Sequence, residues 1–389
     1  ACWAVLVRWL WRKFIWGKGS LALFRICATA PVRGLDFHGC RVCPARIKPD
    51  LRIHSRRHEM NIATAAAIRS RISSWVARAL AIWIGLVPLP ALPAEIAYIT
   101  AKADLPFWDT VGKGVKAVAE ANGYAFSELD SKLSAEMQLN NVRQAIDRRV
   151  AGIVISPTNS KSAEEALILA RRAKIPVAIA DIGASGGDYV SFVKSDNYRG
   201  AYDVGTELAK AMKAQNWASG AYGMVTIELS RRNGQDRTNG FRDAMKDAGF
   251  PREIVLRQMK DYSAEETYRY VKEMLAAHPG LRGFFIETDQ PVAGALRAIR
   301  EAGKEKQLLL VSFDAMPDVV RLLKSGALVA VGMQQPYLMG SSAAGALVSR
   351  LRGHPPAKEI LVPVLVATGR NVDQLMPVAA RTVFGKPLK

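Results

Sequence analysis

Carboxylates, amides, arginines and aromatic residues recur directly after apolar runs in residues 95–389. Carboxylates accept hydrogen bonds from paired hydroxyls, and the planar guanidinium of arginine donates several hydrogen bonds at once. Aromatic rings cover the apolar C–H face of a ring-shaped ligand. This combination predicts a site for a small polyhydroxylated ligand such as a sugar. The residues concerned are Asp104, Phe107, Trp108, Ser156, Asp181, Asp196, Asn197, Arg231, Gln235, Arg237, Tyr262, Thr288, Asp289, Asp314 and Gln334.

Helix capping is the main alternative for these positions. Asp and Asn after a strand are ordinary N-caps of the following helix, and Asp196 and Asp289 fit that role. Capping explains single positions more readily than the whole set. We therefore interpret the set as a ligand site.

Strand-like and helical patterns alternate from Glu95 onward. The strand-like runs are IAYIT, GIVISP, PVAIAD, YVSFV, GMVTI, IVLRQM, GFFIET, LLLVSF, ALVAVGM and EILVPVLVA. The first helical pattern places Val111, Val115 and Val118 on one face. Six more helical patterns follow, in AEEALILARRAK, YDVGTELAKAMKAQ, RTNGFRDAMKDAG, ETYRYVKEMLAAH, VAGALRAIREAG and PDVVRLLKSG. Glycines expected at helix C-termini are Gly123, Gly249, Gly303 and Gly326.

The alternation predicts a parallel α/β architecture. GIVIS and LLLVSF are apolar without alternation, which suits strands covered by helices on both faces. Residues 95–389 exceed one typical doubly wound sheet, so we expect two similar lobes. In open parallel sheets, ligands bind beyond the carboxyl ends of the strands, where the polar residues above stand.

The first 94 residues differ from the rest of the chain. They hold 15 Lys and Arg against 3 Asp and Glu, and they contain all four cysteines. Most of the net charge of +19 therefore belongs to this segment. Beyond it stand no cysteine and only two histidines, His278 and His354, which excludes a cysteine nucleophile and a Cys-rich metal site there. The single pair Cys40 and Cys43 predicts no metal or redox site, and no cofactor is expected.

Residues 60–94 have the pattern of a secretory signal peptide. Arg69, Arg71 and Arg78 flank an apolar stretch, and small Ala94 precedes an abrupt change of composition. We expect cleavage after Ala94. A membrane anchor is the alternative, but the apolar stretch is shorter than the roughly 20 residues that a spanning helix needs.

Residues 1–59 begin with Ala1 and mix Trp-rich and Arg-rich pieces without a sustained period. We expect Met60 to be the true initiator and the preceding residues to be a disordered, over-extended reading frame. The basic and aromatic mixture also fits nucleic-acid binding, but no helix-turn-helix or zinc-finger spacing supports it. No nucleic-acid partner is expected.

Several stretches occur together in a specific order: IAYITAKADLPFWDTVGKGVKAVAEANGY, GIVISPTNS, IPVAIAD, SDNYRGAYDVG, RTNGF, TDQPVAGALRAIREAG, VSFDAMPD and GMQQP. Through them, the chain from Glu95 to about Asp373 resembles the ribose-type periplasmic sugar-binding proteins of ABC transporters, which have the type I periplasmic binding fold. The resemblance implies two doubly wound parallel-sheet lobes joined by three crossover hinge strands, near Ser195–Asn197, Gln334–Pro336 and Val364–Val366. The implied N-terminal lobe is 95–196 plus 335–364, and the C-terminal lobe is 197–334 plus 365–389.

The resemblance also implies roles for individual residues. The stacking aromatics correspond to Phe107 and Trp108, the hydroxyl-binding aspartates to Asp181 and Asp314, and the hinge-side glutamine to Gln334. The remaining implied contacts are Tyr262, Thr288 and either Gln235 or Arg237, between which the pattern leaves the choice open.

Three positions depart from the family pattern. Ribose-binding members usually have asparagine at the positions of Leu105 and Ser156, and arginine at that of Ile182. A site built for particular hydroxyls rejects analogues that lack them. We therefore expect a sugar or related solute that is less polar than ribose, or differently substituted.

The resemblance implies a monomeric periplasmic protein that captures its ligand between two lobes and delivers it to an ABC transporter permease. A ligand sensor for a membrane signalling receptor is the alternative. A LacI-type repressor shares the fold but needs an N-terminal helix-turn-helix where this chain has a signal peptide. A glycosidase would use Asp181 and Asp314 roughly 5–9.5 Å apart. Hydroxyl binding is the simpler role for these acids, and we expect no enzymatic activity.

Overall fold

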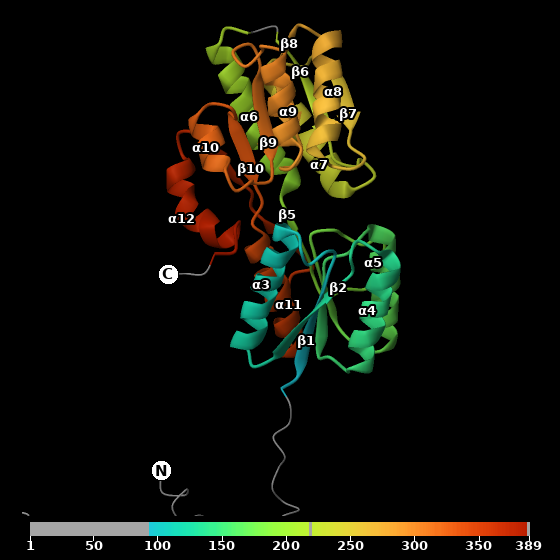
Figure 1. Cartoon of the computed structure of the whole chain (residues 1–389). Coiled ribbons are helices and arrows are strands. Elements are labelled where there is room, and N and C mark those ends of the chain that lie inside the picture. Colours follow the sequence, from blue (N-terminus) through green and yellow to red (C-terminus); the bar gives the residue numbers. More distant parts are fainter. Residues whose placement is uncertain (1–92, 218–219, 387–389) are drawn as a thin grey trace, which may run out of the picture. The chain divides into compact units, whose positions relative to one another are not determined.

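The computed structural model describes residues 93–217 and 220–386 (Figure 1). Residues 1–59 and nearly all of the expected signal peptide, 60–94, lie outside the described residues. Within the described ranges, no helix is both long and apolar enough to cross a membrane.

Six parallel strands form the first sheet, in the order β11-β5-β4-β3-β1-β2. The strands are β1 (Glu95–Thr100), β2 (Ala125–Asp130), β3 (Gly152–Ile155), β4 (Val177–Ala180), β5 (Phe192–Ser195) and β11 (Glu359–Val362). The helices packed on them are α3 (Pro106–Ala121), α4 (Ala135–Asp147), α5 (Ser160–Arg172) and α11 (Pro336–Leu351). We call this unit the first lobe.

The second sheet also has six strands, in the order β12-β10-β9-β8-β6-β7, and only β12 is antiparallel to its neighbour. The strands are β6 (Ala221–Thr226), β7 (Glu253–Gln258), β8 (Leu281–Ile286), β9 (Leu309–Phe313), β10 (Ala330–Met333) and β12 (Leu365–Thr368). The helices are α6 (Asn197–Ala214), α7 (Arg232–Asp247), α8 (Ala264–Ala277), α9 (Val292–Glu301), α10 (Val319–Lys324) and α12 (Val372–Thr382). We call this unit the second lobe.

Strands of the first lobe divide their side chains between two cores. Ile96 and Tyr98 of β1 pack with Val111 of α3 and Met339 of α11. Ile99, which points to the opposite face, packs with residues of α4 and α5. Because these strands are buried on both faces, their sequences are apolar without alternation.

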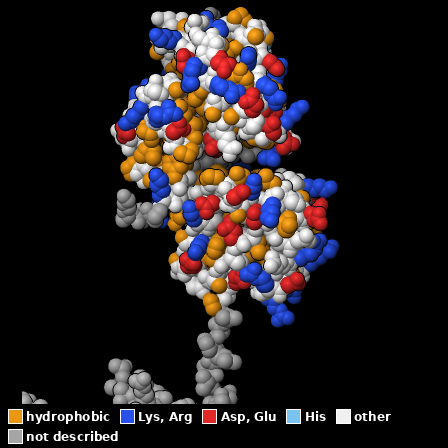
Figure 2. Space-filling view, in the orientation of Figure 1, with side chains coloured by type: hydrophobic (Ala, Val, Ile, Leu, Met, Phe, Trp, Pro, Cys, Tyr) orange, Lys and Arg blue, Asp and Glu red, His pale blue; other side chains and the backbone are white. Residues whose placement is uncertain are grey.

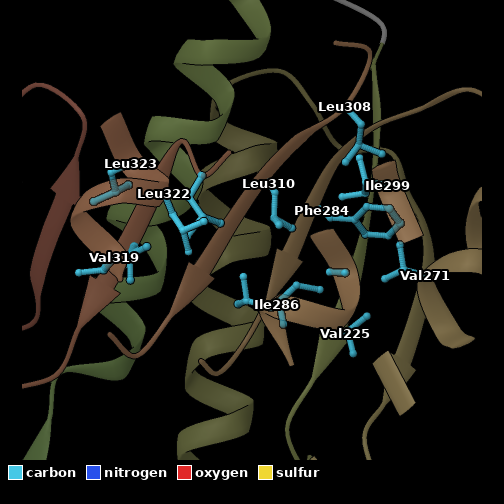
Figure 3. Packing of buried hydrophobic residues seen from close by; sticks show 14 of the residues in the cluster. Val225, Val271, Phe284, Ile286, Ile299, Leu308, Leu310, Val319, Leu322 and Leu323 are labelled. Carbon is cyan, nitrogen blue, oxygen red and sulfur yellow. The ribbon is translucent and has the colours of Figure 1, made fainter. Parts of the chain in front are cut away.

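The second lobe is built in the same way. Figure 3 shows Phe284 and Ile286 of β8 beside Leu310 of β9, on the face covered by helices that include α8 and α9. Phe285, between them in sequence, packs on the other face against α6 and α7. Helices on both faces of each sheet make both lobes doubly wound.

The chain passes between the two sheets three times: from β5 to α6, from β10 to α11, and from β11 to β12. The predicted fold of two doubly wound lobes with three crossovers is therefore confirmed. The four glycines expected at helix C-termini also have the positive φ that such caps require. The values are +81° at Gly123, +89° at Gly249, +65° at Gly303 and +75° at Gly326.

Parts of the element prediction were wrong. It missed β2, because AFSELD is a half-buried edge strand with mixed polarity. It treated EILVPVLVA as one strand, whereas Pro363 and Val364 separate β11 from β12, which belong to different sheets. It also missed α4, which is largely polar, and α11 and α12. Helix α11 is apolar and small on most sides, so its sequence lacks a clear helical stripe.

The surface has no large field of one charge sign on the face seen in Figure 2, where acidic and basic side chains are interspersed. Apolar side chains gather where Figure 1 places α10 and α12. The exposed Val378 belongs to α12.

Candidate functional site

Four predicted site residues meet beyond the carboxyl ends of β8, β9 and β10. The Asp314 carboxylate accepts hydrogen bonds from Gln334 Nε2 at 2.6 Å and from Thr288 Oγ1 at 3.1 Å. Arg237 Nη1 donates to the same carboxylate at 3.2 Å. We call Arg237, Thr288, Asp314 and Gln334 the Asp314 cluster.

Arg237 is buried inside the second lobe, with 2% of its surface exposed. Its Nε donates to Asn197 Oδ1 at 2.8 Å, and its Nη1 also donates to the carbonyl oxygen of Glu287 at 2.7 Å. The guanidinium carbon lies 4.1 Å from the centroid of the Phe313 ring. A buried charge needs such compensation, and these contacts hold the guanidinium in one orientation.

Asp181 and Asp314 occupy similar places in the two lobes. Asp181 follows β4 and Asp314 follows β9, and their φ angles are +74° and +65°. Such left-handed backbone costs most residues about 1–2 kcal/mol, although aspartate tolerates it better than most. Backbone outliers of this kind cluster at functional sites, so both aspartates are good site candidates.

The carboxyl group of Asp181 is buried, and this burial raises its pKa to about 6. The charges of Arg237 and Arg231 lower the pKa, and that of Asp314 raises it. Asp181 of the first lobe is therefore within electrostatic reach of the Asp314 cluster. No hydrogen bond joins the Asp181 carboxyl group to another described side chain, so both of its oxygens remain able to accept one.

Phe107 and Trp108 stand in the first turn of α3. Pro106 occupies the first helical position, where its missing N–H has no intrahelical partner to lose. The two rings are perpendicular, with centroids 4.9 Å apart. Both are half-buried and pack against the core between β1, α3 and α11. One side of the pair thus supports the core, and the remaining surface stays open at the sheet edge.

The structure separates Gln235 from Arg237. Gln235 is exposed, and its Nε2 donates to the carbonyl oxygen of Leu229 at 2.9 Å. Residues two apart on a helix lie about 200° apart around its axis, so the two side chains point in different directions. Arg237 belongs to the Asp314 cluster, whereas Gln235 makes no hydrogen bond to that cluster among the described residues, and its role as a ligand contact stays a prediction.

Tyr262 lies on the same lobe but makes no hydrogen bond to the Asp314 cluster within the described ranges. Its hydroxyl accepts from the backbone N of Glu228 at 3.1 Å, and its φ is +60°. The guanidinium carbon of Arg231 lies 6.0 Å from the ring centroid. The Tyr262 hydroxyl proton remains available for a ligand.

Of the two residues that hold Arg237, Asn197 was among the predicted strand-end residues, whereas sequence reasoning missed Glu287. Glu287 is fully buried at the end of the run GFFIE. Burial raises its pKa to about 8, while the Thr238 hydroxyl, Arg237 and the Ile227 N–H lower it. An acid that directly continues a buried apolar run was the available signal.

The first lobe offers few free polar groups. The Ser156 hydroxyl lies 3.0 Å from Tyr98 Oη and is fully buried. Leu105 and Ile182 are half-buried and apolar. Among the described residues, no group of three or more His, Cys, Asp or Glu side chains is arranged to hold a metal ion.

Comparison of the sequence with known proteins gives a match to a family model and matches to individual relatives. A family model described as periplasmic binding protein domain matches residues 96–355. The ribose import binding protein of Haemophilus influenzae is 30% identical over 263 residues, which are 67% of this chain and 87% of that protein. The D-ribose/D-allose-binding protein of Pseudomonas aeruginosa is 30% identical over 264 residues, or 64% of this chain and 81% of that protein. These relatives are binding proteins, which agrees with the expectation of binding without catalysis.

Solved structures with the same fold include sugar-binding and polyol-binding proteins. A carbohydrate transporter solute-binding protein from Agrobacterium radiobacter, in complex with D-arabinose, matches with a TM-score of 0.67 and 22% identity. The match covers 75% of this chain and 99% of that chain. A solute-binding protein from Bacillus halodurans with bound myo-inositol matches with a TM-score of 0.64 and 20% identity, covering 74% and 99%.

Proposed function

Because the chain belongs to the periplasmic binding protein domain family, we propose that it is the solute-binding component of an ABC importer. It binds a small sugar or a related polar solute in the periplasm and delivers it to a membrane permease. It is exported through a signal peptide at 60–94 and acts as a monomer. The Asp314 cluster carries the proposal, because it offers a fixed set of donors and acceptors at a sheet edge.

Unused hydrogen-bonding capacity at this edge suits ligand hydroxyls. In the described part of the chain, Gln334 Oε1 is buried without a hydrogen-bond partner. Asp181 offers two further carboxylate oxygens. An unpaired buried polar group costs about 1–3 kcal/mol, so a hydroxyl that donates to Gln334 or Asp181 relieves an existing penalty.

The first lobe supplies the aromatic surface of the site, together with the Asp181 carboxyl group. Phe107 and Trp108 cover a C–H face of the ligand ring. Ser156 is engaged with Tyr98, and Leu105 carries no polar group. We therefore propose a ligand with one apolar face and with hydroxyls concentrated toward Asp181 and the Asp314 cluster, such as a deoxy sugar or a pentose.

Binding acts through closure of the two lobes. Phe107, Trp108 and Asp181 belong to the first lobe, whereas the Asp314 cluster belongs to the second. A ligand that contacts both groups has its full set of contacts only when the lobes are together. It therefore shifts the population toward the closed form, which the permease then recognises.

A thermal-shift panel tests the proposal on the purified protein. The panel contains D-ribose, D-allose, D-arabinose and myo-inositol, which are named for similar proteins, together with deoxy sugars. We expect at least one compound to raise the melting temperature, and Asp314→Asn to abolish that shift. Asp318→Asn is the matched control, because Asp318 is an exposed acid paired with Arg321 away from the cluster.

Two results would contradict the proposal. One is an unchanged melting temperature with every sugar and polyol. The other is a shift that Asp314→Asn leaves intact, since the ligand would then bind elsewhere.

A further inference from the structure

Glu287 is a fully buried acid that the proposed ligand contacts do not use. Its Oε1 accepts from Thr238 Oγ1 at 2.6 Å, and its Oε2 accepts from the backbone N of Ile227 at 3.0 Å. Its carbonyl oxygen accepts from Arg237 Nη1 at 2.7 Å. Thr238 and Arg237 belong to α7, and Ile227 follows β6. One residue thus joins α7, the end of β6 and the guanidinium of the Asp314 cluster.

The contact with Thr238 fixes α7 next to Arg237. At the start of α7, the N-cap residue Arg231 makes no capping hydrogen bond through its side chain. Thr238 lies one residue beyond Arg237 and is bonded to Glu287, so a movement of the Glu287 carboxyl group moves the helix turn that carries Arg237.

Arg237 has two acids near it but pairs through its side chain with only one. Asp314 receives a hydrogen bond from Nη1 at 3.2 Å. The Glu287 carboxyl oxygens are engaged by Thr238 and Ile227. The charged groups around Glu287 are Arg237 and Arg242 on α7, with Asp314 beyond Arg237 and Asp289 two residues further along the chain.

A protonated Glu287 leaves this arrangement electrically balanced. Burial raises the pKa of Glu287 to about 8 despite the opposing effects of Thr238 and Arg237. At neutral pH the acid therefore carries a proton, and Arg237 and Asp314 together have no net charge. Ionisation of Glu287 adds a second negative charge beside Arg237, which draws the guanidinium away from Asp314.

We propose that Glu287 is a proton-carrying positioning residue of the ligand site: it anchors Arg237 while neutral and weakens ligand binding when it ionises. The inference rests on the proposed function, because it concerns the same site. Glutamine at this position can keep both side-chain contacts, with its Oε1 accepting from the Ile227 N–H and its Nε2 donating to Thr238 Oγ1, as a protonated carboxyl group would. It differs from the acid only in having no proton to lose, so Glu287→Gln separates the titration from the anchoring.

The first experiment needs no ligand. In protein carrying ¹⁵N-labelled arginine, the Nε–Hε signal of Arg237 is assigned by its loss in Arg237→Lys and followed from about pH 6 to about pH 10. In the native protein it moves with an apparent pKa near that of Glu287, and in Glu287→Gln it does not. Glu253→Gln is the matched control. Glu253 is a partly exposed residue of β7 that pairs with Arg242 of α7, and in this variant the Arg237 signal titrates as it does in the native protein.

The second experiment uses the compound with the largest thermal shift in the panel of D-ribose, D-allose, D-arabinose, myo-inositol and deoxy sugars. Its affinity for the native protein falls about threefold or more between pH 7 and pH 9, as linkage to one ionising group requires. In Glu287→Gln, the affinity does not fall between pH 7 and pH 9. If no compound of the panel binds, the deoxy sugars included, the proposed function fails and the arginine signal alone decides the role of Glu287. An Arg237 signal that stays fixed in the native protein, or moves equally in Glu287→Gln, overturns the inference, as do superimposable affinity profiles.

Discussion

Replacing Glu287 by glutamine is expected to stabilise the protein at neutral and alkaline pH. The folded protein holds Glu287 with a pKa of about 8, raised from 4.5 mainly by burial. Between these two values the folded state binds a proton that the unfolded state has released. Stability therefore falls as pH rises from about 4.5 to about 8 and is level above that. Glutamine has no such proton, so the stability of the variant does not fall over this pH range.

The magnitude follows from the size of the pKa shift. Each unit corresponds to about 1.4 kcal/mol, so the native protein loses on the order of 3 kcal/mol by pH 7 and 5 kcal/mol above pH 8. Glu287 is fully buried, so solvent screening does not reduce these values. Near pH 4.5 the two proteins have similar stability, because the glutamine amide replaces the protonated carboxyl group in both hydrogen bonds.

Urea denaturation at several pH values measures the effect. The free energy of unfolding of Glu287→Gln minus that of the native protein is expected to grow with pH between about 5 and 8. Glu253→Gln serves as the control and is expected to give a difference that does not vary over this range. A pH-independent difference for Glu287→Gln refutes the argument, because it means that Glu287 has the same protonation in the folded and unfolded states.

Three further predictions concern the ligand, the helix packing and the N-terminus. Asp181, with a pKa of about 6, accepts ligand hydroxyls through both oxygens when ionised and loses acceptor capacity and charge when protonated. Affinity by calorimetry should therefore fall by up to about tenfold per pH unit below pH 6, and Asp181→Asn should lose this dependence. Gly240→Ala should lower the stability of the fold by several kcal/mol, on the order expected for overpacking, because its Cβ would lie 2.1 Å from a carbonyl oxygen of α6. Gly345→Ala is the control: its Cβ meets nothing within 4 Å, so thermal unfolding should show it to be neutral or stabilising. N-terminal sequencing of exported protein should begin at Glu95, and a longer N-terminus would contradict cleavage after Ala94.

The fold was predictable because its signals are local. Continuous apolar runs such as GIVI mark strands buried on both faces. Glycines after helical patterns mark C-caps, as the positive φ of Gly123 illustrates. The prediction missed edge strand β2 because its side chains are half exposed and its sequence has no clear alternation of apolar and polar residues. The prediction also missed the separation of β11 from β12 at Pro363, because sequence alone does not say to which sheet each half of an apolar run belongs.

The sequence by itself determined the parallel α/β class and the placing of polar residues at strand ends. It also put Asp181 and Asp314 among the candidates, because residues that follow parallel strands gather at one sheet edge. The tertiary structure decided which of these side chains meet. It placed Arg237 rather than Gln235 beside Asp314, and it engaged Ser156 with Tyr98. It also buried Glu287 behind Arg237 and raised its pKa, which no local pattern encodes, since desolvation depends on everything that surrounds the carboxyl group.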